Sequence, residues 1–247
     1  MVGKLKGMLV TLVAMCAFPV MAQAASAPTL ETTDVSAGNS NFFANGTAIT
    51  IDARPDGQDG ARISWNGGEM LVDSKTHVFG GSHESDVTIE KTSIVMNDGN
   101  IGNLIGGGLH KSHVKEANIK INGGTIKGIN GGGASSANWT TCHRPWYATA
   151  DANSTNRVDV VNLEINGGKS DLVFGGNEGM GYVGKVNMTI NGGTWGWVTA
   201  AGSNGYTKAS EVVITDGTIK VFQGVNRGKI DGADTIVAGG QIEKFYI

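Results

Sequence analysis

The clearest pattern in this chain is a repeat in which apolar and polar positions recur around a pair of glycines. Three copies read Ile-Asn-Gly-Gly, and four weaker copies keep the final glycine. The final glycines are Gly68, Gly99, Gly124, Gly168, Gly193, Gly217 and Gly240. Their successive spacings are 31, 25, 44, 25, 24 and 23 residues. A unit of about 24 residues, with extra chain in two intervals, is too short for a repeated helical pair and indicates a solenoid.

Apolar side chains occupy alternate positions before each final glycine. Three residues before it stand Trp65, Met96, Ile121, Ile165, Ile190, Ile214 and Val237. Five residues before it stand Ile63, Ile94, Ile119, Leu163, Met188, Val212 and Thr235. Polar residues such as Lys120, Glu164 and Thr189 lie between them. A period of two is typical of a strand that is buried on one face only.

A second apolar segment follows each final glycine. Two residues after it stand Met70, Ile101, Ile126, Ser170, Trp195, Ile219 and Ile242. Five residues after it, in the last six copies, stand Leu104, Ile129, Val173, Val198, Phe222 and Phe245. Small residues, mostly glycine, follow seven to nine positions after the final glycine in most copies. They mark a second corner, because glycine tolerates sharp turns. The pattern predicts an all-β parallel β-helix of about seven coils between Ile63 and Ile247, in which stacked coils share one core.

Asparagine recurs two residues before the final glycine in five of the seven copies. The five are Asn66, Asn97, Asn122, Asn166 and Asn191. Stacked side chains of this kind can form an amide ladder along the solenoid. A row that binds sugar or metal is the alternative, but a turn with a ladder accounts for the asparagines without any ligand. We therefore interpret them as structural.

The composition agrees with one elongated domain. The chain has 39 Gly but only 4 Pro among 247 residues, and 17% of its residues are charged. Low proline excludes collagen-like and proline-rich disordered chains. The formal net charge is −3, which argues against a nucleic-acid partner.

The N-terminus has the parts of an export signal. Lys4 and Lys6 precede an apolar run from Met8 to Met21, and Ala22-Gln23-Ala24 provides a small-x-small cleavage site. The run is shorter than the roughly 20 residues of a membrane-spanning helix, and a lipid anchor on Cys16 fits poorly because Met15 precedes it. We therefore expect a signal peptide at 1–24, an N-terminal segment and cap at 25–62, and a secreted or cell-surface protein exported through the Sec pathway, with no membrane span after cleavage.

The leader also changes the remaining charge and cysteine count. Its removal takes away two lysines, leaving 17 basic against 22 acidic residues, or −5. Cys142 is then the only cysteine, so the fold must form without an internal disulfide.

In repeat style, the segment from Ile63 to Ile247 resembles the right-handed parallel β-helices of bacterial surface proteins, especially the passenger domains of autotransporter-type adhesins. The resemblance implies a virulence-associated surface scaffold and transfers no catalytic residue. The chain stops inside a coil, at Phe245-Tyr246-Ile247, without a polar cap. An open end is a template for pairing, so we expect either further coils in a longer protein or end-to-end association. The alternative is that Phe245 and Tyr246 fold over the end as a cap.

The longest interval contains an inserted loop, expected at 135–156 on the surface. Its candidate ligand-binding residues combine flat apolar faces with hydrogen-bond donors, which suits a glycan or a protein partner. They are Trp139, His143, Arg144, Trp146 and Tyr147. The alternative is that the aromatic residues only pack over a face of the solenoid. Cys142 beside His143 has no zinc-site spacing, so no metal or cofactor is predicted.

No catalytic residue stands out. Asp98 and Asp216 share a repeat position but belong to distant coils, which indicates turn chemistry. A small acidic patch beside the loop is the main enzymatic candidate, made of Asp159, Glu164, Asp171 and Glu178. The histidines of the early coils are interpreted as solvated side chains; they are His77, His83, His110 and His113. No phosphate loop, Ser-His-Asp signature or calcium nonapeptide repeat is found.

Two functions follow from these patterns. The favoured one is a non-enzymatic, adhesin-like β-solenoid that presents the aromatic loop to a surface glycan or protein. The alternative is a polysaccharide-degrading enzyme, a lyase or a glycosidase similar to a phage tailspike, which would need two carboxyl groups across the scissile bond. A purely structural assembly element is the third reading.

Overall fold

The computed structural model describes residues 26–34, 39–84, 86–110, 112–134, 156–179 and 181–246. These residues form strands and no helix, so no described helix could cross a membrane. The predicted signal peptide and the inserted loop, apart from Asn156, lie outside the described residues.

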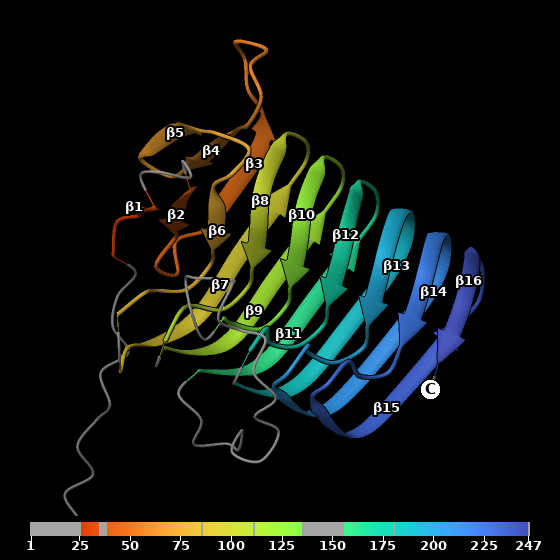
Figure 1. The fold of residues 1–247 in the computed structure, drawn as a ribbon. Coiled ribbons are helices and arrows are strands. Elements are labelled where there is room, and N and C mark those ends of the chain that lie inside the picture. The colour runs from red at the N-terminus through yellow and green to blue at the C-terminus, as the bar shows by residue number, and fades with distance from the viewer. Residues whose placement is uncertain are drawn as a thin grey trace, which may run out of the picture.

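A parallel β-helix of six stacked coils follows an N-terminal set of short strands (Figure 1). The coils are β7–β8, β9–β10, β11–β12, β13, β14 and β15–β16. The strands of the first three coils are β7 (Thr88–Met96), β8 (Asn100–Ile105), β9 (His113–Ile121), β10 (Thr125–Asn130), β11 (Arg157–Ile165) and β12 (Lys169–Phe174). Those of the last three are β13 (Tyr182–Thr199), β14 (Tyr206–Gln223), β15 (Lys229–Val237) and β16 (Gln241–Tyr246). Successive coils pair with one another in parallel. The predicted fold is confirmed, with six coils where about seven were expected.

Each coil has two outward surfaces. We call the surface over β7, β9, β11, β15 and the first halves of β13 and β14 the long-strand face. The surface over β8, β10, β12, β16 and residues 194–199 of β13 and 218–223 of β14 is the short-strand face. β13 and β14 each run through the corner as one strand and so contribute to both faces.

The predicted registers form one continuous core. Met96, Ile121, Ile165, Ile190 and Ile214, the residues three before the final glycine, are all fully buried. The residues at the positions two and five after the glycine are also buried in the first five coils. Each coil closes the core of the next, because a single coil has no opposite layer to cover its apolar face.

The corners confirm the turn chemistry. The final glycine of all six coils has a positive φ, from 82° at Gly240 to 109° at Gly217, a conformation that residues with a Cβ rarely adopt. Asp98 and Asp216 accept hydrogen bonds at 2.7 Å from the amide of the glycine that follows each. These two carboxylates are therefore part of the turns, as predicted.

The amide ladder is also confirmed, in four of the five predicted asparagines. Side-chain hydrogen bonds of 2.7 to 3.1 Å connect successive members. The continuous row is Asp52, Asn97, Asn122, Asn166, Asn191 and Thr215. A second row, which the sequence analysis missed, runs on the long-strand face through Asn118, Asn162 and Asn187.

The first copy of the repeat is a hairpin and not a coil, although Ile63 is fully buried in the core as expected, with Trp65 and Met70 packed against it. Asn66 and Gly67 form the tight turn of an antiparallel hairpin between β4 (Ala61–Trp65) and β5 (Gly68–Val72), with Gly67 at φ 104°. The first rung of the core comes instead from β3 (Ile49–Ala53), which pairs in parallel with β7. Asn-Gly is as suitable for a hairpin turn as for a solenoid corner, and only the partner strand distinguishes them.

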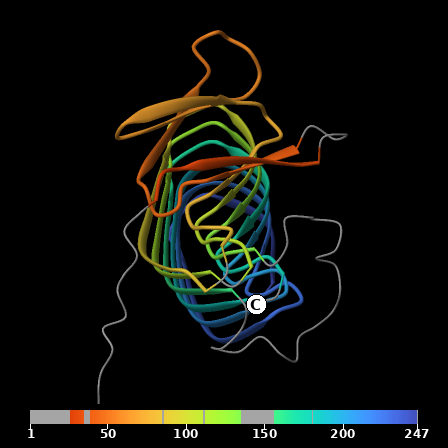
Figure 2. The same ribbon diagram turned by 90° about the vertical axis from the view of Figure 1, so that its left-hand side faces the viewer.

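The N-terminal strands lie across one end of the solenoid (Figure 2). An antiparallel pair, β1 (Thr29–Asp34) and β2 (Asn39–Phe43), joins the stack through β6 (His77–Phe79), which pairs with β8. Stacked rings of Phe43 and Phe79, with centroids 4.7 Å apart, belong to a second small core there. This end of the core is therefore covered.

The last described coil is more open. β15 and β16 pair only with β14 among the described strands. Val237 and Phe245 occupy core registers but are 47% and 41% exposed, and Tyr246 is 54% exposed. The Phe245 ring stacks on Phe222 at 5.1 Å. End-to-end association through this coil stays a prediction.

Candidate binding site

The residues that flank the inserted loop lie together at the second corner of their coil. Ala134 forms parallel bridges with Leu109 of the preceding coil and Glu178 of the following one. The Asn156 side-chain amide donates to the Ala134 carbonyl at 3.4 Å and to the Gly108 carbonyl at 2.9 Å. The chain therefore leaves and rejoins the solenoid at one corner, as expected of a loop inserted between coils. Trp139, His143, Arg144, Trp146 and Tyr147 lie outside the described residues.

This anchoring predicts that the solenoid folds without the loop. Deletion of Ser136–Ala152 leaves residues 135 and 153–156 between Ala134 and Arg157, five in all. The neighbouring coils connect the equivalent positions, Leu109 to His113 and Glu178 to Tyr182, with three residues. We expect an unchanged far-ultraviolet circular dichroism spectrum and a melting temperature within a few degrees of the parent. Loss of the β spectrum would show that the loop is part of the core.

A hollow of about 270 Å³ lies at the second corners of the next coils. It is lined by Leu172, Phe174, Glu178, Trp197, Ser203, Asn204, Asn226 and Arg227. Glu178 is the residue that bridges Ala134, so this hollow begins one coil beyond the base of the loop. Pockets that combine apolar side chains with a few polar groups are typical of ligand sites.

An apolar ledge borders the hollow. Leu172 of β12 and Trp197 of β13 are direct partners on adjacent strands and are 38% and 37% exposed. The Ser170 hydroxyl donates to the Leu172 carbonyl at 2.9 Å and accepts from the Leu172 amide at 3.2 Å. At this point of β12 two successive residues, Asp171 and Leu172, are both exposed. The side chain of Leu172 thus joins the Trp197 indole on the surface rather than entering the core.

The polar groups of the hollow differ in charge and exposure. Arg227 is exposed, has a φ of 61° and has no ion-pair partner among the described residues. A positive φ is uncommon outside glycine and is often associated with functional turns. Asn204 is buried and Asn226 half-buried. These groups offer hydrogen-bond donors and acceptors beside the Trp197 ring.

Glu178 is the one carboxylate that the described residues contribute to the hollow. Burial raises its pKa to about 7, although the hydrogen bond from the Asn130 amide, at 3.2 Å, and the charge of Lys127 both act to lower the pKa. The carboxyl group therefore gains or loses its proton near neutral pH. A carboxyl group of this kind can donate a hydrogen bond that an ordinary carboxylate cannot.

The four carboxylates of the possible acidic patch lie on different surfaces. Asp159 accepts from the Arg157 guanidinium at 2.6 Å and pairs with His113 at 2.9 Å near the start of β11. Glu164 pairs with Lys120 at 3.0 Å near the other end of the same strand. Asp171 lies on β12, on the short-strand face, and only Glu178 reaches the hollow. The four carboxylates are neighbours in sequence, but the coil distributes them over different surfaces.

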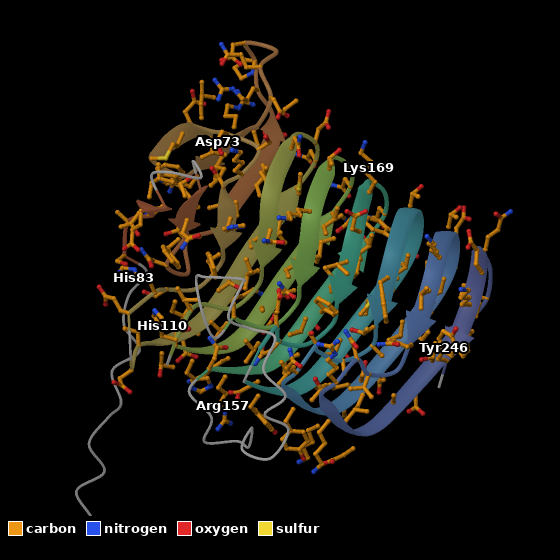
Figure 3. The ribbon with its side chains drawn as sticks, viewed as in Figure 1. Asp73, His83, His110, Arg157, Lys169 and Tyr246 are labelled. Carbon is orange, nitrogen blue, oxygen red and sulfur yellow. The ribbon has the colours of Figure 1, made fainter. Side chains whose placement is uncertain are left out.

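The four histidines have separate environments and form no row. The interpretation of His77 as a solvated side chain was wrong: it is buried, its ring accepts from the Asn103 backbone N–H at 3.0 Å, and burial lowers its pKa to about 4. His83 pairs with Glu31 at 3.2 Å. His83 and His110 lie towards the N-terminal end, away from Arg157 (Figure 3). Within the described part of the chain, no group of three His, Cys, Asp or Glu side chains could hold a metal.

Comparison of the chain with protein-family models, with curated proteins and with solved structures gave no match. The assignment of a function therefore depends on the geometry of the surfaces described above.

Proposed function

We propose that this protein is a non-enzymatic, exported β-solenoid that serves as an adhesin-like scaffold and binds a glycan beside the inserted loop. The observation that carries the proposal is the exposed ledge of Leu172 and Trp197 next to the hollow. An indole face with amides and a guanidinium around it suits a sugar, which has one apolar face and many hydroxyl groups. The aromatic residues of the loop, from Trp139 to Tyr147, stay candidates for binding the same ligand.

The alternative of a polysaccharide-degrading enzyme is favoured by one observation, the raised pKa of Glu178. A carboxyl group that is protonated near pH 7 is suited to general acid catalysis. A second carboxylate on the opposite side of the bond is also needed, and the described lining of the hollow offers none. Binding without cleavage is therefore the better-supported function.

Substitution of Trp197 tests the proposal. Wild type, Trp197→Ala and the loop deletion are compared on a glycan array, and affinities for the glycans that bind are then measured by calorimetry. We expect Trp197→Ala to weaken binding by between a few-fold and about tenfold, because an aromatic contact contributes about 0.5–1.5 kcal/mol. Tyr246→Ala, which removes a more exposed aromatic side chain from the last coil, is the control and leaves the affinity unchanged.

Two outcomes contradict the proposal. If wild type and Trp197→Ala bind every glycan equally, the ledge is not a binding surface. Release of oligosaccharides from a polymer by the purified protein, abolished in Glu178→Gln, establishes the enzyme instead.

A further inference from the structure

A groove lies on the short-strand face, beside the ledge. It has a volume of about 650 Å³ and extends from Asn100 on β8 to Glu243 on β16. It therefore crosses all six coils. With adjacent strands roughly 4.8 Å apart, five spacings give a length of about 24 Å along the solenoid axis. Such a shape fits an extended chain that lies across the strands.

Glycines, which have no side chain, help to form the groove. The position three residues after the final glycine is Gly102, Lys127, Asp171, Gly196, Lys220 and Glu243 in successive coils. A Cβ on Gly196 would stand 2.6 Å from the Asp171 carbonyl oxygen, so the backbone approaches too closely there for any other residue. The result is a gap in the row between Asp171 and Lys220, over β13.

Charged side chains form ion pairs on the long-strand face but not in the groove, within the described part of the chain. On the long-strand face, lysines pair with glutamates of the neighbouring coil at 2.6 to 3.3 Å, as in Lys115–Glu90, Lys91–Glu116 and Lys185–Glu211. In the groove, Lys127, Lys169 and Lys220 have no ion-pair partner among the described residues. Asp171 and Glu243, which also line it, have none either. The same spacing between coils thus pairs charges on one face and leaves them available on the other.

The lining also indicates the chemistry of the ligand. Three lysines against two carboxylates make the groove locally positive on a chain whose net charge is −3. Lysine is a compact charge that suits a carboxylate or sulfate group. Hydroxyl groups of Thr125, Thr194 and Thr218 repeat along the groove between the charges. Lys169 lies at the start of β12, at the edge of this face in Figure 3.

We propose that this groove binds a linear anionic glycan along the solenoid axis, with its acidic groups on Lys127, Lys169 and Lys220. The assignment names the ligand class of the proposed glycan-binding scaffold and rests on that function, but it uses the groove residues rather than the ledge. The Leu172–Trp197 ledge lies one position further along the same strands, so one long chain can contact both.

The probe is alginate, a linear polyuronate, with dextran as the neutral comparison. Binding is measured by biolayer interferometry at 50 mM and 300 mM salt for the full chain and for the triple variant Lys127→Gln, Lys169→Gln, Lys220→Gln. The matched control is the triple variant Lys91→Gln, Lys115→Gln, Lys185→Gln, which removes the same charge from the long-strand face. Removal of three exposed charge contacts is expected to weaken alginate binding by about tenfold or more. The control keeps wild-type affinity, and dextran binding is the same in all three.

A second variant tests the opposite direction. Asp171→Asn with Glu243→Gln removes the two acids from the groove and is expected to strengthen alginate binding severalfold. This arm keeps the proposal falsifiable if the lysine variant does not fold, which its melting curve reveals.

The outcomes separate the groove from the ledge. Equal losses in both lysine variants, or no alginate binding at 50 mM salt, overturn the groove. Equal binding of polyglutamate, with the same dependence on the groove lysines, overturns the glycan assignment. Loss in Trp197→Ala with no effect of the groove lysines supports the ledge alone and overturns the groove. Loss in the groove variant with none in Trp197→Ala supports the groove and contradicts the ledge.

Discussion

Ile190→Asp is expected to unfold the solenoid around its centre. Ile190 is fully buried between its partners Ile165 and Ile214 on the neighbouring coils. The substitution removes an apolar side chain whose burial contributes about 2–3 kcal/mol. It also places a carboxyl group where nothing compensates its desolvation, which costs several kcal/mol more. The sum is comparable with the 5–15 kcal/mol stability of a typical domain, and the coils on both sides lose their neighbour.

Val213→Asp is the matched control. Val213 lies on the next coil, one residue before Ile214, and points outward, where it is half-buried. It receives the same apolar-to-acidic change, but water reaches the new carboxylate, so the effect is small. Urea unfolding followed by circular dichroism measures both variants. A midpoint for Ile190→Asp close to that of wild type is incompatible with the core register.

The coils could be predicted because each carries its own local signals. A corner glycine, apolar residues at fixed distances on both sides and an asparagine at the corner recur in Ile119–Gly124 and again in Leu163–Gly168. These signals agree with one another, and a repeat multiplies the agreement. The structure has the same residues in the core and the asparagines in a ladder.

The first copy shows where local signals fail. Trp65-Asn66-Gly67-Gly68 matches the corner motif, but Asp73 stands five residues after the glycine, where every other copy has an apolar residue. That missing core residue was the available sign that the segment is not a coil. The hairpin is decided by the antiparallel pairing of β4 with β3, a contact between strands that no periodicity of a single strand contains.

The candidate site was less predictable than the fold. Trp197 stands four residues after a corner, where the other coils carry Asn103, Gly128, Leu172, Val221 and Lys244, so no repeated pattern marks it. Glu178 was grouped with three other acids because they are close in sequence. Its burial depends on the second corners of neighbouring coils, through Asn130 and Ala134. The second amide row had a detectable signal, an asparagine six residues before the glycine in three successive coils.

Glu178→Gln is expected to stabilise the protein above pH 7 and to have no effect at pH 4. The pKa of Glu178 is raised from 4.5 to about 7 in the folded state. Between these values the unfolded chain has released the proton while the folded chain retains it, so the stability of wild type falls as pH rises. At 1.36 kcal/mol per pKa unit, the full loss is about 3 kcal/mol. Glutamine keeps the hydrogen bond from Asn130 and does not ionise, so it avoids this loss.

The measurement is the free energy of urea unfolding at pH 4, 5.5, 7 and 8.5 for both proteins. Buried His77, whose pKa is lowered to about 4, destabilises both equally as the pH falls below 6.5 and cancels in the difference. Glu164→Gln is the control, and it is expected to destabilise the protein at neutral pH. Asn166 and Lys120 lower the pKa of Glu164, so its carboxylate favours folding there. The expected difference between Glu178→Gln and wild type grows from pH 4.5 to about 7 and is constant above. A difference that does not change with pH would mean that Glu178 is already ionised in the folded protein, and the hollow would then hold a fixed negative charge beside Trp197.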